Sequence, residues 1–196
     1  MKAQVYLQRV EDFPDFIDVW NQHYRDIPCA VTVVPTKSFA MRGGIIEINL
    51  MALTNAARRE KRVIAADIPD MAAYGPCIKV GEFLLPSGLM AVGPDGHIVA
   101  KSISPGFAGL SHAGYSQAAA VHDYAEALCT AAGTSLKKLL RVQYFVSDIA
   151  AFPGIAMAWI SRVGTQPLPF VCVQTPPAMP APGAILIADF WIATED

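Results

Sequence analysis

The sequence is poor in charge and has no long apolar run, and these two absences limit what the protein can be. Of its 196 residues, 16% are charged and 53% are hydrophobic, and the formal net charge is −2. A chain with so little positive charge has no electrostatic footprint for nucleic acid, so we expect no nucleic-acid partner. No apolar stretch approaches the roughly 20 residues that a membrane-spanning helix needs, so we also expect no membrane partner.

The sequence also lacks the clustered cysteines and histidines that hold metal ions. Cys29, Cys77, Cys129 and Cys172 are scattered without a CxxC pair, and the four histidines show no ligand spacing. We therefore expect reduced, mostly buried cysteines and no metal site. The start, Met-Lys-Ala-Gln-Val-Tyr, has neither the apolar region nor the cleavage site of a signal peptide. These features predict a cytoplasmic protein.

A third absence is half of an internal repeat. Residues 2–54 align without a gap on residues 141–193, at an offset of 139 positions. The identical pairs include Gln4 and Gln143, Phe13-Pro14 and Phe152-Pro153, Trp20 and Trp159, Pro28 and Pro167, Val34 and Val173, Gly44 and Gly183, Ile46 and Ile185, and Ile48 and Ile187. About 80 residues of a further unit precede the second copy and none precede the first. The sequence therefore predicts half a domain (1–54), a linker (55–61) and a complete domain (62–196).

Apolar periodicity predicts the order β-α-β-β for the repeated segment. In the first copy the predicted elements are strand 3–8, helix 13–24, strand 29–34 and strand 45–53; in the second, the strands are 142–147, 170–174 and 184–192. Acidic residues at positions 11, 12 and 15 suit a helix N-terminus, and a proline in the first turn is tolerated there. Trp20 and Trp159 fall on the apolar helix face, so we expect both in the core.

The segment between the copies adds three strands and a helix. The predicted strands are 62–66, 77–81 and 82–87, and the predicted helix is 116–132, followed by Gly133 as its C-terminal glycine. Helices on one side of a mixed sheet make an α+β two-layer sandwich. The Gly/Ser/Pro-rich stretch 101–115 is either a functional loop or a neutral insertion.

These residues resemble the reactive intermediate deaminase (Rid) family, also called YjgF-type or endoribonuclease L-PSP proteins. The matching text is Arg62-Val-Ile-Ala-Ala-Asp, Tyr74-Gly-Pro, Lys79-Val-Gly-Glu-Phe-Leu-Leu-Pro-Ser-Gly, Ala131-Ala-Gly-Thr-Ser-Leu and Val142-Gln-Tyr-Phe-Val-Ser-Asp. The resemblance implies a chorismate-mutase-like fold that assembles as a homotrimer with clefts between neighbours. It also implies hydrolysis of reactive enamines and imines to a carbonyl compound and ammonia, without metal or organic cofactor.

The resemblance implies some site residues and withholds others. Family members carry an arginine two residues after the proline that opens the penultimate strand, where this sequence has Ala30 and Pro169. A family glutamate in the last strand is matched by Glu47 in the first copy but by Leu186 in the second. Tyr74 matches the family's cleft tyrosine. We therefore expect Glu47 as the acid/base, with Tyr74 supplying a hydroxyl from a neighbouring unit. The alternatives are an outward-facing strand residue for Glu47 and an ordinary packed aromatic for Tyr74.

Five further residues are candidates for substrate binding. The resemblance places Ser87 and Gly88 at the hairpin end beside the tyrosine, and Cys172 in or next to the strand that lines family clefts, with buried packing as the alternative for Cys172. Phe145, in the matching segment that begins at Val142, is the fourth candidate. Arg42, two residues before Gly44, is a candidate replacement for the missing arginine, although a solvated turn residue is the alternative.

Two functions remain open on sequence alone. The first is a Rid-like enamine or imine deaminase with altered carboxylate recognition, acting on a small-molecule substrate. The second is a non-catalytic small-molecule-binding or structural member that has kept the fold. The ribonuclease activity in the family's older name has no electrostatic support at a net charge of −2. The abundant apolar residues predict a homo-oligomer, and we expect the half domain to be covered by its own complete domain or by a second protomer.

Overall fold

The computed structural model describes residues 1–56, 60–70, 74–99, 112–167 and 169–194. The elements, in chain order, are β1 (Lys2–Leu7), η1 (Val10–Asp12), α1 (Phe13–His23), β2 (Ala30–Pro35), β3 (Ile46–Met51), β4 (Arg62–Ile64), β5 (Cys77–Val80), β6 (Phe83–Leu85), α2 (His112–Ala132), η5 (Leu136–Lys138), β7 (Leu139–Val146), η6 (Ile149–Ala151), α3 (Phe152–Val163), β8 (Phe170–Gln174) and β9 (Leu186–Ala193). The predicted strands and helices are therefore present, with ends shifted by a few residues. None of the described helices is long and apolar enough to cross a membrane.

The strands form two sheets, one in each part of the chain. Residues 1–54, here called the N-terminal unit, form a three-stranded sheet of order β2-β1-β3. Residues 62–196, the C-terminal unit, form a six-stranded sheet of order β4-β5-β6-β9-β7-β8. In both, the central strand of the repeat pairs in parallel with the strand after its helix and antiparallel with the last strand. Each copy of the repeat thus has the same local topology.

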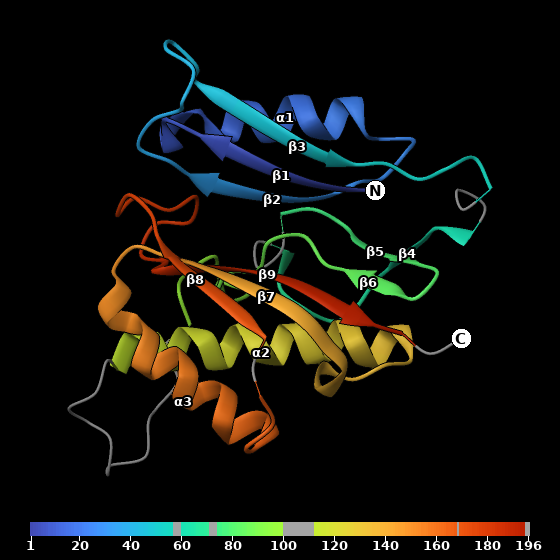
Figure 1. Cartoon of the computed structure of the whole chain (residues 1–196), viewed down its shortest axis with the longest axis vertical. Coiled ribbons are helices and arrows are strands. Elements are labelled where there is room, and N and C mark those ends of the chain that lie inside the picture. Colours follow the sequence, from blue (N-terminus) through green and yellow to red (C-terminus); the bar gives the residue numbers. More distant parts are fainter. Residues whose placement is uncertain (57–59, 71–73, 100–111, 168, 195–196) are drawn as a thin grey trace.

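Helices α2 and α3 lie on one face of the six-stranded sheet, and the N-terminal unit lies on the other (Figure 1). This arrangement confirms the predicted α+β sandwich with helices on one side. The sandwich core is built from apolar side chains of α2, α3, β7 and β9, and it contains Trp159. Trp20 is buried in the corresponding place beneath α1. Both tryptophans are therefore core residues, as predicted.

Helix α2 begins four residues earlier than predicted. The sequence predicted its start at Ser116, but the helix runs from His112, because residues 113–115 continue it. Part of the Gly/Ser/Pro-rich stretch 101–115 is consequently helical, and residues 101–111 lie outside the described residues, as do residues 57–59 of the predicted linker. The helix ends as expected, with Gly133 at a φ of 75°.

The gapless alignment of the two copies is wrong by one residue in its last part. As far as the ends of β2 and β8 the offset of 139 holds. The Thr36 backbone amide donates to the Leu7 carbonyl, just as the Thr175 backbone amide donates to the Val146 carbonyl. Beyond that point, the glycines with matching left-handed backbone are Gly43, at a φ of 80°, and Gly183, at a φ of 82°. The loop of the second copy is therefore longer by one residue.

This shift changes the partners assigned to the last strand. In the N-terminal sheet Tyr6 lies opposite Glu47, and in the C-terminal sheet Phe145 lies opposite Ile187. The structural counterpart of Glu47 is therefore Ile187, and the pairing of Glu47 with Leu186 was wrong. By the same offset of 140, Asn49 corresponds to Asp189.

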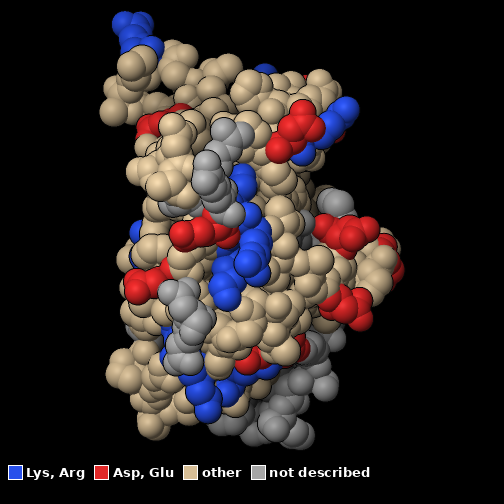
Figure 2. All heavy atoms as spheres, turned by 90° about the vertical axis from the view of Figure 1, so that its right-hand side faces the viewer, with Lys and Arg blue, Asp and Glu red and all other residues tan. Residues whose placement is uncertain are grey.

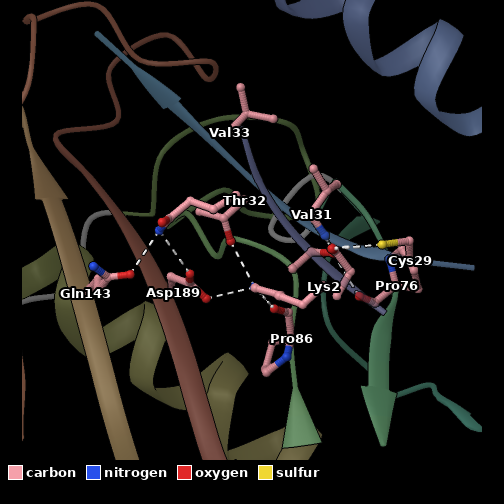
Figure 3. A network of polar contacts seen from close by, with 12 residues as sticks. Lys2, Cys29, Val31, Thr32, Val33, Pro76, Pro86, Gln143 and Asp189 are labelled. Carbon is pink, nitrogen blue, oxygen red and sulfur yellow. Dashed lines mark hydrogen bonds and ion pairs between the residues drawn. The ribbon is translucent and has the colours of Figure 1, made fainter. Parts of the chain in front are cut away.

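A buried ion pair joins the two units. The Lys2 ammonium lies 2.7 Å from Asp189 Oδ1, and their side chains are 4% and 1% exposed. The same ammonium donates to Thr32 Oγ1 at 3.0 Å and to the Pro86 carbonyl at 2.5 Å. Figure 3 shows Lys2 reaching between these three partners. All three ammonium protons therefore have acceptors, which offsets the cost of burying the charge.

The repeat counterparts Gln4 and Gln143 also bond to each other across the junction. Gln4 Nε2 donates to Gln143 Oε1 at 2.9 Å and to Asp189 Oδ2 at 3.4 Å. The two units are thus joined face to face through polar groups at the centre of an otherwise apolar contact.

Elsewhere on the surface, basic and acidic side chains are interspersed among uncharged ones on the face drawn in Figure 2.

Replacing Lys2 should cost much more than replacing an exposed lysine. We expect Lys2→Met to lower the free energy of unfolding by about 3 kcal/mol, because Asp189 is left buried without a counter-charge. The double variant Lys2→Met/Asp189→Leu should recover most of the loss. Urea unfolding measures both, with Lys137→Met at an exposed site as control. A Lys2→Met protein as stable as the control would contradict this account.

The core histidine makes stability depend on pH. His122 is buried, and its Nε2 lies 2.8 Å from the Tyr144 hydroxyl. Burial, with a smaller contribution from the Arg162 charge, lowers the pKa of His122 from 6.5 to about 3. The unfolded chain therefore binds a proton below pH 6.5 that the folded chain excludes, and stability must fall as the pH falls through this window.

We expect this histidine to contribute up to about 1.4 kcal/mol of lost stability per pH unit below its unfolded pKa. Urea unfolding at several pH values between neutral and mildly acidic measures the slope. His122→Gln should be less stable at neutral pH but should show a flatter slope. His97→Gln, at an exposed position, should keep the wild-type slope. An unchanged slope in His122→Gln would show that another group is responsible.

Candidate functional site

Three of the residues predicted for the site meet at the junction between the units. The Tyr74 hydroxyl accepts from the Val33 amide at 2.8 Å and donates to the Val33 carbonyl at 3.4 Å. Ser87 Oγ accepts from the Val31 amide at 3.0 Å, and the Gly88 amide donates to the Val31 carbonyl at 2.9 Å. The predicted tyrosine, serine and glycine therefore come together, and all three bind the backbone of β2.

Protein atoms fill the space between these residues. A Cβ at Gly88 would lie 2.5 Å from the Tyr74 hydroxyl oxygen and 3.1 Å from methyl carbons of Thr32 and Ile187. A Cβ at Gly75 would lie 2.6 Å from Ser87 Oγ. Glycine is needed at both positions because Tyr74 and Ser87, from the same segment of the chain, leave no room for a Cβ, and Thr32 and Val31 of the N-terminal unit also lie close. Within one chain, this junction is a packed contact.

Tyr74 is suited to hold a proton. Burial raises the pKa of Tyr74 well above its ordinary value of 10, which the hydrogen bond from Val33 offsets only in part. Its ring packs edge-on against Phe13, with ring centroids 5.1 Å apart. At neutral pH the hydroxyl can therefore both donate and accept a hydrogen bond. The carbonyl and the amide of Val33 in β2 take up these two hydrogen bonds.

Glu47 lies on the other side of β1 from Tyr74. Tyr74 contacts β2, and Glu47 belongs to β3, in a sheet of order β2-β1-β3. The Glu47 carboxylate is exposed and accepts from Asn49 Nδ2 at 3.2 Å. Its neighbour on β1 is Tyr6, whose pKa is raised by burial and by the Glu47 charge. Within one chain the acid/base candidate thus pairs with Tyr6.

A pocket of about 620 Å³ opens between the ends of the repeated strands. Its lining consists of Tyr6, Val34, Pro35, Thr36, Lys37, Gln143, Phe145, Val173, Gln174, Thr175, Pro176 and Pro177. Tyr6 and Phe145 are repeat counterparts, as are Val34 and Val173. The pocket therefore lies between the two copies, with apolar walls and a few polar groups, which is typical of a small-molecule site.

Polar side chains form part of this lining. The Tyr6 hydroxyl donates to Gln4 Oε1 at 3.0 Å, and Gln4 in turn donates to Gln143. Lys37 contributes an exposed ammonium to the lining. Tyr6, Gln143 and Lys37 were not predicted from the sequence. In the sequence, the exact match of Gln4 with Gln143 between the copies and the candidate Phe145 were the signals that pointed to this region.

The remaining predicted residues are spread over the structure. Phe145 lines the pocket, as a substrate-binding residue would. Arg42 is exposed in the turn before β3. Cys172 is half-buried in β8, and burial raises the pKa of its thiol, so the thiolate is disfavoured at neutral pH. Cys29, Cys77 and Cys129 are buried and unbridged, as predicted.

The positions of the missing arginine carry no charge. Ala30 is fully buried against Ile78 and Val80 of the C-terminal unit, and Pro169 precedes β8. Among the described residues, no group of three or more histidine, cysteine or carboxylate side chains is placed to hold a metal ion. Any charge recognition in the pocket must therefore come from other side chains, of which Lys37 is in place.

The geometry assigns the Tyr74 hydroxyl a measurable structural role. We expect Tyr74→Phe to lower the free energy of unfolding by about 1–3 kcal/mol, because the Val33 amide and carbonyl lose their partner in a buried place. Tyr115→Phe is the matched control, since that hydroxyl contacts Ser161 at an exposed site. Chemical denaturation of the two variants decides the point, and equal small losses would mean that the junction does not depend on this hydroxyl.

Comparison with known proteins identifies the fold. No protein-family model and no curated protein matches this chain. Among solved structures, YEO7 from yeast matches with a TM-score of 0.56 at 23% identity, covering 69% of this chain and 99% of its own. RidA from the Antarctic bacterium Psychrobacter matches with a TM-score of 0.53 at 21% identity, covering 68% and 99%.

A third neighbour carries the family name in its description. YyfA from Yersinia pestis, described as a protein of the conserved Rid family, matches with a TM-score of 0.55 at 20% identity, covering 68% of this chain and 99% of its own. Each neighbour is matched over almost its whole length, while about a third of this chain lies outside each match. This chain therefore contains the chorismate-mutase-like α+β fold of the Rid (YjgF-type) proteins.

Proposed function

We propose that this protein hydrolyses a small enamine or imine to a carbonyl compound and ammonia, in the pocket between the two copies of the repeat. The observation that carries the proposal is the position of Glu47. Its carboxylate lies beside Tyr6, and Tyr6 lines a pocket of about 620 Å³ with apolar walls. A carboxylate near a pocket with apolar walls is the minimum that this hydrolysis needs.

The reaction requires one water and one group that moves protons. An imine carbon is electrophilic, so a water held by Glu47 attacks it while the carboxylate takes a proton from that water. Glu47 returns this proton to the nitrogen, which gives a neutral carbinolamine. The carbinolamine hydroxyl then loses its proton to Glu47, which passes it to the amine as the C–N bond breaks, so the products are the carbonyl compound and ammonia. Tyr6 stays protonated at neutral pH because its pKa is raised, so its oxygen can accept a hydrogen bond from the attacking water.

Recognition of a substrate carboxylate differs in this proposal from that of a typical family member. Neither Ala30 nor Pro169 can supply a cation. Lys37 lies in the pocket lining, and an ammonium binds a carboxylate as a point charge rather than through a bidentate fork. We assign Lys37 this role, with Phe145 as part of the apolar wall, and leave Arg42 as a second cation outside the lining. In this assignment Tyr74, Ser87 and Gly88 position β2.

The alternative is a non-catalytic member that binds a small molecule or serves a structural role. Its specific support is the use of Tyr74, Ser87 and Gly88 to bind the β2 backbone, which leaves them no free donor directed at a ligand. Such a protein would bind an imine analogue in the pocket and show no rate above the uncatalysed one. The two functions are therefore separated by a rate measurement.

Replacing Glu47 should abolish most of the catalysed rate. We expect Glu47→Gln to lower kcat by about 100-fold or more, because the amide cannot take the proton from water. The assay supplies 2-imino acids from an L-amino-acid oxidase and follows keto acid formation above the spontaneous rate. Glu82→Gln, at an exposed turn outside the pocket, is the matched control and should keep the wild-type rate.

Lys37→Met in the same assay separates recognition from chemistry. It should raise KM for an imino acid while leaving kcat nearly unchanged, since it removes binding that substrate and transition state share. A wild-type protein with no rate above background would reject the deaminase and favour the non-catalytic alternative. A measurable rate that survives Glu47→Gln would reject the role given to Glu47.

A further inference from the structure

One part of the contact between the two units joins unlike surfaces. On the N-terminal side it uses the outer edge of β2, an edge strand of its sheet. On the C-terminal side it uses the segment 74–88, which here includes Tyr74, Ser87 and Gly88. This segment bonds the outward amides and carbonyls of Val31 and Val33. Such a head-to-tail contact can repeat from copy to copy.

The C-terminal unit carries its own version of the β2 edge. Strand β8 is the repeat counterpart of β2, and it is the last strand of the six-stranded sheet in the part of the chain that the structure describes. Because Thr175 donates inward to Val146, the alternate amides at Phe170 and Cys172 point to the outer edge. They correspond to the amides of Val31 and Val33, which bind segment 74–88.

The two edges differ in burial. On β2 the side chains of Val31, Thr32 and Val34 are at most 2% exposed. On β8 their counterparts Phe170, Val171 and Val173 are 44%, 45% and 42% exposed. An uncovered strand edge with apolar side chains is a template for pairing with another chain. The C-terminal unit therefore holds both parts of such a contact, segment 74–88 and the uncovered edge of β8.

We propose that β2 acts as an intramolecular cap that prevents self-association of the C-terminal unit. It occupies segment 74–88, which would otherwise receive β8 of a second copy of this chain. The occupant of the β8 edge is therefore segment 74–88 of a second copy whose own β2 has left. The observation behind this assignment is the contact within the chain, which shows what segment 74–88 binds.

Tethering explains why the cap prevails. Because β2 and segment 74–88 belong to one chain, β2 acts at an effective concentration that reaches about the millimolar range, far above the concentration of a second copy at micromolar protein. The buried Lys2–Asp189 pair adds a contact that β8 cannot copy unchanged, because the counterpart of Lys2 is Arg141. Self-association through β8 thus depends on how firmly β2 is docked. This inference does not depend on the proposed enzymatic function.

Proline at position 31 tests the cap in the whole chain. Val31→Pro removes the amide that binds Ser87 and leaves the bonds of β2 to β1, because that amide points outward from an edge strand. We expect the variant to associate at about tenfold lower protein concentration than the wild type, or lower, reaching multiples of 21.0 kDa by light scattering.

A second change shows whether β8 is responsible. Val171→Lys places a charged chain at the counterpart of Thr32, whose methyl group would lie 3.1 Å from a Cβ at Gly88. Because Val171 is exposed, the change should leave folding intact. Val31→Pro/Val171→Lys should return to the wild-type association behaviour, and Val171→Lys alone should not differ from the wild type.

The proposal fails on either of two results. It is overturned if a folded Val31→Pro protein associates no more than the wild type, or if Val171→Lys leaves its association unchanged. Circular dichroism establishes whether the variant is folded. If it is not, Lys2→Met provides the same test, because it weakens the docking of β2 and leaves every residue of segment 74–88 unchanged in sequence, although it removes the bond to the Pro86 carbonyl. Lys2→Met must then associate more than the wild type, and Val171→Lys must reverse the effect.

Discussion

The buried Lys2–Asp189 ion pair is the interaction on which the arrangement of the two units depends. Each charge comes from a different unit, so neither is neutralised unless the sheets meet in this one orientation. Removing two such charges from water costs several kcal/mol per ion, which only good geometry and further hydrogen bonds offset. The bonds to Thr32 and Pro86 supply that geometry. A misdocked N-terminal unit would leave at least one charge buried without a partner, and so the pair selects a single arrangement.

The same junction explains why residue types associated with chemistry do not assemble a conventional cleft in this chain. Tyr74 and Ser87 satisfy the amides of an edge strand that would otherwise be buried without partners. Glycine at position 88 lets the backbones approach. A hydroxyl that is needed to satisfy a buried amide is not available for a ligand unless the strand moves. The space for a small molecule consequently lies beyond the junction, where the repeated strands end and diverge.

The sequence was sufficient for local structure because each repeated element has a strong pattern. Examples are the proline in the first turn of α1 and α3 and the tryptophan that each of these helices buries. It was insufficient where identity misled. Gly44 and Gly183 match as letters, but the left-handed φ belongs to Gly43, which only the backbone reveals. Glu47 was found through a family resemblance, whereas its neighbour Tyr6 and the partner pair Lys2 and Asp189 depend on tertiary contacts that no sequence pattern encodes.

The high apolar content has a structural counterpart in what each copy of the repeat leaves uncovered. Ile46, Ile48 and Leu50 of β3 are 40–60% exposed, whereas the corresponding strand β9 buries its side chains beneath α2 and pairs with β6. The two copies are thus covered in opposite ways. In the N-terminal unit β2 is covered and the last strand, β3, is open. In the C-terminal unit the last strand, β9, is covered and β8 is open. An assembly in which both β3 and β8 were covered would need one further surface for each strand. Because the tether keeps β2 on segment 74–88, it decides which of these surfaces a second copy can reach.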